Sequence, residues 1–159
     1  MIDVGVLTIS DSSASGRRED VSGPEVRRRC EELGWRVAVS DVVPDVHNQI
    51  AAKLVEWADG RSLQLILTTG GTGAAKRDIT PEATASVIER ELPGLTELMR
   101  SEGLKKTKFA ALSRAKAGTR DKTLIVNLPG SPKGAVESLN AIADIVPHAV
   151  DLLGGRTEH

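Results

Sequence analysis

Four turn segments of this chain each follow a short apolar run and carry residue types that bind phosphate groups. They are Ser10-Asp11-Ser12, Pro44-Asp45, Gly70-Gly71-Thr72-Gly73 with Asp78, and Pro129-Gly130-Ser131-Pro132. If the runs before them are parallel strands, the turns share one edge of a sheet, where open α/β sheets bind their ligands. The pattern therefore predicts a small-molecule site, and a phosphorylated ligand for it.

The glycine segment Gly70–Gly73 is the sharpest of the four signals. Glycine adopts positive φ and admits close approach, so several backbone N–H groups can face an anion. The segment is not a Walker loop, because Lys76 lacks the preceding glycine and the following Ser or Thr, and the third glycine of a dinucleotide fingerprint is missing. A simple tight turn is the alternative. Lys76 and Arg77 are candidate phosphate ligands here or, alternatively, a solvated charged face.

Asp45 and Asp78 are the candidate catalytic carboxylates, since each follows a predicted strand. Such a pair can bind Mg²⁺ together with phosphate oxygens, or accept the paired N–H donors of a guanine-like ring edge. The alternatives are structural: Asp45 as a helix cap, and Asp78 as a loop residue bonded to its own backbone.

Further candidates lie in the other loops. Ser131 as a helix cap followed by Pro132 would leave backbone N–H groups aimed at an anion, or would form an ordinary strand-to-helix turn. Ser113-Arg114 offers a hydroxyl and a fork-shaped cation, and Asp20 belongs to the first loop. A receiver-domain phosphoacceptor site is excluded, because it needs an aspartate after the third strand and the third predicted strand ends in Thr69-Gly70-Gly71. A serine-hydrolase site is excluded because the chain has no Gly-x-Ser-x-Gly elbow.

Alternating strand and helix signals must position these turns. Strands are predicted at 4–9, 35–43 and 63–69 and in a hairpin over 113–127. Helices start near 22, 45, 80 and 131, with a short one near 95–99, and Pro147 is expected to kink or split the last helix. A mobile loop is expected over 12–22, and Thr80 is expected to cap its helix. The pattern predicts a three-layer α/β/α sandwich forming a single domain over residues 1–159.

Composition excludes several classes of function. The chain has 159 residues, 40% hydrophobic and 27% charged, with a net charge of −1, so it has no basic footprint for nucleic acid. The single Cys30 falls at a predicted core position, and three dispersed histidines do not support a zinc or iron site. No apolar stretch approaches a membrane span and no export signal opens the chain, so we expect a cytoplasmic protein with no membrane partner.

Taken together, the motifs resemble one known family. Leu7–Asp11, Thr68–Gly73, Arg77–Thr84, Leu112–Arg114 and Asn127–Pro132 are similar, in family order, to the MogA/MoaB family of molybdenum cofactor biosynthesis, which includes the G domain of gephyrin. The similarity runs from about Val4 to Gly154.

The resemblance implies a molybdopterin adenylyltransferase, in which the terminal phosphate of molybdopterin attacks the α-phosphate of ATP in the presence of Mg²⁺. It implies a mostly parallel sheet with one antiparallel edge strand, a homotrimer or hexamer, and a molybdenum-inserting protein that receives the product. By resemblance, Asp45 and Asp78 are the essential aspartates and tentative Mg²⁺ ligands, and Ser113 lies near the pterin.

The remaining residues that the motifs and the resemblance assign to substrate binding lie in the same loops. They are Ser10, Asp11, Ser12, Asp20, Gly70, Gly71, Thr72, Gly73, Arg77, Thr80, Arg114, Pro129, Gly130, Ser131 and Pro132. Two other functions stay open from sequence: a carrier that binds molybdopterin without modifying it, and a nucleotide hydrolase. The presence of both aspartates favours the transferase.

Overall fold

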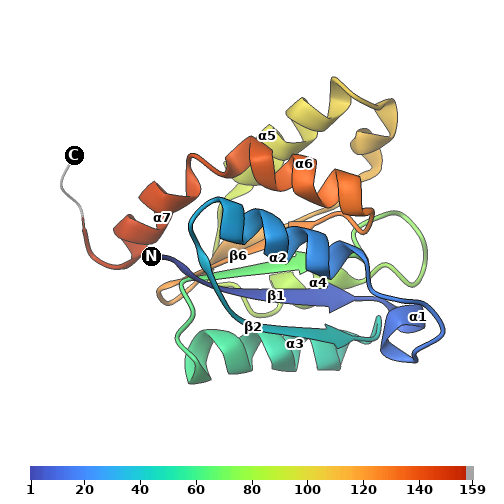
Figure 1. Ribbon diagram of the computed structural model, residues 1–159, viewed down its shortest axis with the longest axis horizontal. Coiled ribbons are helices and arrows are strands. Elements are labelled where there is room, and N and C mark those ends of the chain that lie inside the picture. Colours follow the sequence, from blue (N-terminus) through green and yellow to red (C-terminus); the bar gives the residue numbers. More distant parts are fainter. Residues whose placement is uncertain (157–159) are drawn as a thin grey trace.

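A computed structural model, which describes residues 1–156, shows a six-stranded sheet covered by helices on both faces (Figure 1). Its strand order is β2-β1-β3-β6-β5-β4. The strands are β1 (Asp3–Ile9), β2 (Arg36–Val43), β3 (Leu65–Thr69), β4 (Arg90–Glu91), β5 (Ala117–Arg120) and β6 (Thr123–Leu128).

The sheet is mostly parallel, as the predicted fold class requires. Strands β2, β1, β3 and β6 run parallel, whereas β5 pairs antiparallel with β6 and the two-residue β4 pairs antiparallel with β5. The antiparallel arrangement therefore occurs at one edge. The hairpin expected over 113–127 is confirmed as β5 and β6, and Asp121 turns it with a positive φ of 48°.

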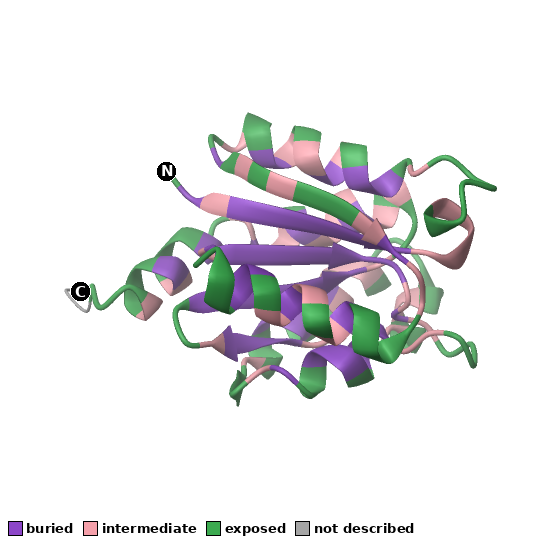
Figure 2. Ribbon diagram, turned by 90° about the horizontal axis from the view of Figure 1, so that it is seen from below, coloured by how far each residue is buried: buried purple, intermediate pink, exposed green. Residues whose placement is uncertain are grey.

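Two helical layers enclose the sheet. The helices are α1 (Asp11–Ala14), α2 (Ser22–Glu32), α3 (His47–Val55), η1 (Glu56–Gly60), α4 (Thr80–Ala85), α5 (Pro93–Leu104), η2 (Lys108–Leu112), α6 (Pro132–Ile142) and α7 (Val146–Leu153). One core cluster joins the sheet to α2, α5, α6 and α7, and the other joins it to α3 and α4. The central strands are buried along their length while each helix exposes its outer side (Figure 2).

Several element boundaries differ from the predicted ones. The segment expected as a loop over 12–22 contains the short helix α1, because the Ser10 hydroxyl accepts a hydrogen bond from Ser13 N and caps a turn. The kink or split predicted at Pro147, in contrast, is confirmed as a split: α6 ends at Ile142 and Pro147 lies in the first turn of α7. Within residues 1–156, no helix combines the length and apolarity needed to cross a bilayer.

A buried amide ties the sheet to α4 behind the carboxyl edge of the sheet. The side chain of Asn127 is fully buried in β6. Its Nδ2 donates to the hydroxyls of Thr68 and Thr84, at 3.0 and 2.9 Å, and its Oδ1 accepts from Lys116 N at 3.0 Å. Because every polar atom of the amide is paired, the group joins β3, α4 and the β5 side of the sheet at one point.

Replacing this amide should destabilise the whole fold. Asn127→Ala leaves two buried hydroxyls and a backbone N–H without partners, so the free energy of unfolding should fall by about 2–4 kcal/mol. Urea denaturation measures the change. Asn48→Ala, at an exposed position of α3, is the matched control and should change it by less than about 0.5 kcal/mol. Equal stability of the two variants would contradict this role of Asn127.

Candidate active site

The register of the parallel strands brings the four predicted turns to one edge. Ile9 pairs with Val43, and Thr69 pairs with both Thr8 and Leu128, so four strands end in nearly the same row. The chain leaves this row through the four turns, on the side to which the strand arrows point in Figure 1.

Two glycines make the close approach of these turns possible. Gly70 has φ +106°, and a Cβ there would collide with the carbonyl oxygen of Ile9. Gly71 has φ +69°, and a Cβ there would collide with the Thr80 hydroxyl and lie 3.0 Å from Asp45 Oδ1. Only glycine combines such φ values with so little space, so the segment is more than a simple tight turn.

The glycine loop uses its carbonyls in internal bonds and leaves its N–H groups free. Gly71 O accepts from Thr80 N, Thr72 O from Arg114 N, and Gly73 O from Arg114 Nε. Among residues 1–156, by contrast, no group accepts a hydrogen bond from the backbone N–H of Gly71, Thr72 or Gly73. Unpaired N–H groups in a glycine turn form an anion-binding concavity.

The turn before α6 contributes a second set of donors. Ser131 caps α6 as predicted, its hydroxyl accepting from Gly134 N at 3.1 Å. Within the described part of the chain, the N–H groups of Gly130 and Ser131 donate to no protein group. A Cβ on Gly130 would lie 3.3 Å from Gly70 Cα, so both sets of free donors belong to one surface.

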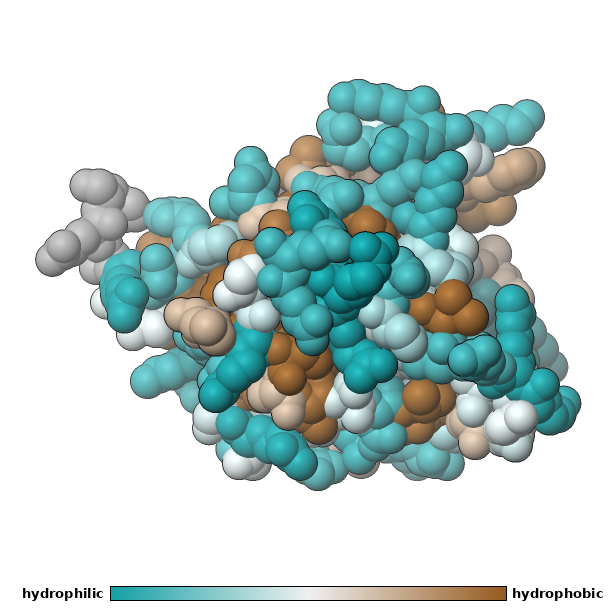
Figure 3. Space-filling view, in the orientation of Figure 1, coloured by the Kyte–Doolittle hydropathy of each residue, from teal (hydrophilic) through white to brown (hydrophobic). Residues whose placement is uncertain are grey.

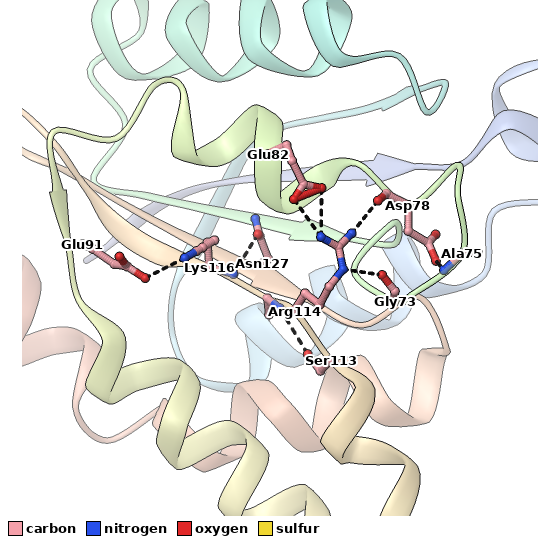
Figure 4. Close-up of polar contacts among 10 residues, drawn as sticks. Gly73, Ala75, Asp78, Glu82, Glu91, Ser113, Arg114, Lys116 and Asn127 are labelled. Atoms are coloured by element: carbon pink, nitrogen blue, oxygen red, sulfur yellow. Dashed lines mark hydrogen bonds and ion pairs between the residues drawn. The ribbon is translucent and has the colours of Figure 1, made fainter.

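Arg114 holds the loop between these donors and α4 in place (Figure 4). Its guanidinium donates to Gly73 O at 2.8 Å, to Asp78 O at 2.6 Å and to the Glu82 carboxylate at 2.7 Å. The hydrogen bond and charge of Arg114 lower the pKa of Glu82, which keeps the pair ionised. Because each nitrogen of the fork donates to a protein group, Arg114 positions the loop.

Asp11, Asp45 and Arg77 form a second clamp, between the turns after β1, β2 and β3. Asp11 N donates to Asp45 Oδ2 at 3.0 Å, and Asp45 N donates to Asp11 Oδ1 at 2.9 Å. Arg77 donates hydrogen bonds to the same Asp11 carboxylate from Nε and Nη2, with N···O distances of 2.7 to 3.0 Å. These bonds lower the pKa of Asp11. Arg77, a predicted phosphate ligand, is thus bonded to a carboxylate of the protein. The alternative in which Asp45 caps a helix is wrong, because the N-cap of α3 is Val46 and no side chain caps this helix.

Asp45 carries an electrostatic cost in this position. Burial raises the pKa of its carboxyl, and the neighbouring carboxylates of Asp11 and Asp78 raise it further, against the opposing effect of Asp11 N–H. A carboxylate held ionised against burial and like charges favours a cation or a hydrogen-bond donor beside it.

The carboxylates fit a magnesium ion that is shared with a substrate. In each carboxylate one oxygen accepts a hydrogen bond from a backbone N–H: Asp45 Oδ2 from Asp11 N, and Asp78 Oδ2 from Ala75 N. The other oxygen, Oδ1, has no hydrogen-bond partner among the described residues. Residues 1–156 contain no cluster of three acidic, His or Cys side chains suited to a metal. Two carboxylates with phosphate oxygens are the set that Mg²⁺ uses at nucleotide sites.

A cavity of about 460 Å³ opens beside the free N–H groups, bounded by the glycine loop, the turn before α6, and a wall made by α5 and η2. Of the predicted site residues, the structure places eight along it. These are Gly71, Thr72, Gly73, Asp78, Ser113, Pro129, Gly130 and Ser131. Asp45 lies just behind Gly71, at the edge of this group.

Other predicted residues lie away from this cavity. Both Asp20 oxygens accept bonds from protein groups, Thr8 Oγ1 at 2.8 Å and Gly23 N at 3.0 Å, and Asp20 lines a separate cavity of about 280 Å³. The hydroxyls of Ser10 and Ser12 lie 3.2 Å apart in the α1 turn. Pro132 forms the first turn of α6.

Thr80 does not cap α4, contrary to the prediction. The N-cap position belongs to Ile79, and the Thr80 hydroxyl is buried beside Gly71 with no hydrogen-bond partner in the described chain. The chain enters the helix one residue earlier than expected because Thr80 N is bonded to Gly71 O.

The α5–η2 wall was not anticipated from the sequence. It adds to the cavity lining Thr96, Met99, Arg100, Lys106, Thr107, Phe109 and Leu112. The spacing near 95–99 predicted a short helix, and nothing local indicated that its far end would lie against the turn before α6.

Fold and site together define an α/β domain that binds a phosphorylated small molecule at the carboxyl edge of a parallel sheet. Residues 5–148 match the family described as "Probable molybdopterin binding domain", and the chain belongs to this family, as its resemblance to MogA and MoaB proteins indicated.

Similar proteins include bacterial and eukaryotic members. The chain is 44% identical over 156 residues to a molybdopterin adenylyltransferase of Helicobacter pylori, covering 97% of this chain and 89% of the relative. The structure of the molybdopterin biosynthesis enzyme MoaB from Thermus thermophilus superposes with a TM-score of 0.93 at 52% identity, covering 98% of both chains. A molybdenum cofactor synthesis protein of Drosophila melanogaster, cinnamon, is 44% identical over 154 residues. That match covers 96% of this chain, which spans only 26% of the fly protein.

The role assigned to Arg114 predicts a loss of loop order without loss of the fold. Arg114→Lys removes the fork that joins Gly73 O to Asp78 O, so the hydrogen-bonded backbone amides of Ala75 and Asp78 should exchange hydrogen at least about tenfold faster. Arg28→Lys, which changes a similar forked arginine on α2, is the matched control and should leave this segment unchanged. Unchanged exchange in Arg114→Lys would contradict the assignment.

The raised pKa of Asp45 predicts a stability gain on removing its charge. The folded protein holds the proton more tightly than the unfolded chain, so the wild type loses stability as pH rises through the folded-state pKa. Asp45→Asn lacks this loss and keeps an oxygen for Asp11 N, so its melting temperature should exceed that of wild type at pH 7 by about 2–4 °C, with a smaller difference at pH 4. A difference that grows toward low pH would contradict the electrostatic account.

Proposed function

We propose that this chain is a molybdopterin adenylyltransferase, which transfers AMP from ATP to the terminal phosphate of molybdopterin. The observation that carries the proposal is a cavity lined by free backbone N–H groups, with the Asp78 carboxylate along it and the Asp45 carboxylate behind Gly71. The names of the relatives support the same reaction, because several are molybdopterin adenylyltransferases of similar length.

The free N–H groups are suited to the charge that the reaction develops. A phosphate oxygen of molybdopterin attacks the α-phosphorus of ATP, the bond to the bridging oxygen of the β-phosphate breaks, and pyrophosphate leaves. Negative charge is then spread over phosphate oxygens. Preorganised N–H groups of Gly71 to Gly73 and of Gly130 and Ser131 can donate to these oxygens without reorganisation, because the protein uses them for nothing else.

The carboxylates serve a different part of the reaction. Asp45 and Asp78 would hold Mg²⁺ through their unpaired Oδ1 atoms, and the ion, when bound, would neutralise charge on the α-phosphate and the leaving group. Around them, the Arg114 fork and the Asp11–Arg77 clamp fix the loops that carry both carboxylates. Fixed geometry of this kind is how phosphoryl-transfer sites obtain most of their rate.

The remaining features of the proposal follow the resemblance. We infer a cytoplasmic homotrimer, or a hexamer, that passes its product to a molybdenum-inserting protein. Substrate contacts are proposed for the cavity residues Thr72, Ser113 and Pro129, with Thr80 below the glycine loop.

The direct test is to incubate the purified chain with molybdopterin, ATP and Mg²⁺ and to look for adenylylated molybdopterin by chromatography. We expect the product, together with an equal amount of pyrophosphate. Molybdopterin that binds but stays unmodified would make the chain a carrier and would refute the transferase.

Removing one carboxylate should separate catalysis from folding. Asp78→Asn keeps an oxygen that can accept from Ala75 N, so the fold should survive while kcat falls by about 100-fold or more, as for loss of a group that stabilises transition-state charge. Asp59→Asn, at an exposed aspartate paired with Arg120 on another part of the surface, is the matched control and should keep wild-type rates. Wild-type turnover in Asp78→Asn would refute the role of Asp78.

A further inference from the structure

The chain offers a single aromatic surface to a ligand. It contains one Phe, two Trp and no Tyr. Trp35 and Trp57 are buried, with exposed fractions of 8% and 1%, whereas Phe109 is 70% exposed. A large apolar ring left in water does not contribute to the core, and as part of an apolar patch it can serve a binding surface.

The exposed ring sits on a short element that is held firmly. Phe109 belongs to η2, where Phe109 N donates to the Thr107 hydroxyl at 3.3 Å and Thr107 N donates to Gly103 O at 3.0 Å. A Cβ on Gly103 would lie 3.0 Å from the Cβ of Ala110, so η2 packs directly on the end of α5. The ring is therefore presented from a fixed backbone, and a ligand does not have to order it.

Phe109 and its neighbour Leu112, which is 58% exposed, line the same cavity as the glycine loop and Ser131. Apolar side chains reach the surface at this corner of the molecule, beyond α5 (Figures 1 and 3). One part of the cavity lining is thus apolar and consists of Phe109 and Leu112, here called the apolar lip. Another part consists of the free N–H groups. That combination fits a molecule with a flat ring at one end and phosphate at the other.

The protein itself makes little use of the ring. The Nζ atom of Lys108 lies 6.0 Å from the centroid of the Phe109 ring, which is the outer limit of a cation–π contact. The ring is available for stacking, which suits a planar heteroaromatic ring on the phenyl face.

We propose that Phe109 is a substrate-contact residue on which the planar ring of one substrate, pterin or adenine, stacks, with Leu112 completing the apolar lip. The proposal rests on the function given above in so far as the substrates carry such rings. It assigns the ring end of the ligand to η2 and the phosphate end to the glycine loop.

The single phenylalanine allows a direct test. Protein made with 4-fluorophenylalanine carries one ¹⁹F signal, from position 109 alone. The probes are ATP with Mg²⁺ and, separately, a phosphate ester of a 6-hydroxymethyl pterin, each titrated by calorimetry and by ¹⁹F NMR. We expect one probe to shift the signal through the ring current of its stacked ring, and the probe that does so identifies the substrate.

Variants provide the second readout. Phe109→Leu keeps an apolar side chain without a π face, and it should bind the shifting probe roughly 5- to 150-fold more weakly, the range for loss of one base–aromatic stack. The other probe should bind as before. Leu152→Ala, at an exposed apolar position of α7 outside the cavity, is the matched control and should bind both probes normally.

Three results would overturn the proposal. In the first, both probes bind, neither shifts the ¹⁹F signal, and each binds Phe109→Leu as tightly as wild type. The ring then does not contact substrate, while the transferase assignment stands. A signal in free protein that depends on protein concentration would show that another copy covers the ring. Failure of both probes to bind wild-type protein would refute the stacking proposal and the proposed function together.

Discussion

The shared row in which four parallel strands end is the constraint on which the rest of the structure depends. Because Thr69 pairs with both Thr8 and Leu128, the turns that follow these residues leave the sheet side by side. A side chain cannot fit at Gly70, where a Cβ would collide with Ile9 O, and a Cβ on Gly130 would lie 3.3 Å from Gly70 Cα. The same crowding draws loop carbonyls into bonds with Thr80 N and Arg114, which leaves the N–H groups facing outward. The free N–H groups, which are suited to an anion, are thus a consequence of how the sheet edge is packed.

Charge at this edge is arranged so that arginines hold the loops, while Asp45 and Asp78 each keep one unpaired carboxylate oxygen. All three nitrogens of Arg114 donate to protein oxygens, and Arg77 donates to Asp11 through two of its nitrogens. Asp45, in contrast, is kept beside two other carboxylates in a partly buried position, which raises its pKa. Such an arrangement reduces stability and is maintained where a site needs it. A bound cation and phosphate would relieve it, which links ligand binding to the order of the loops.

Much of the site could be predicted from local sequence, because strand ends, glycine turns and helix caps are local signals. The positions of Gly70 to Gly73, Ser131 and the two aspartates relative to strands followed from them, and so did the three-layer fold. Partners distant in sequence could not be predicted in this way. Arg77 reaches Asp11 across 66 residues and Arg114 reaches Glu82 across 32, so residue type suggested ligand binding where the structure shows clamps. The cap predicted at Thr80 was wrong for a related reason, since a bond to the distant Gly71 O fixes the start of α4. The α5–η2 wall depends on tertiary packing throughout, and Phe109 gave no sequence signal.

The central claim is that this sheet edge transfers an adenylyl group. Its most direct test follows the α-phosphorus of ATP, with the label placed on that atom, in the presence of molybdopterin and Mg²⁺. The account predicts that the label appears in a compound that also contains the pterin, in proportion to the enzyme's turnovers. Recovery of the label only as free AMP or ADP would contradict the account, because the site would then be activating water rather than the phosphate of molybdopterin.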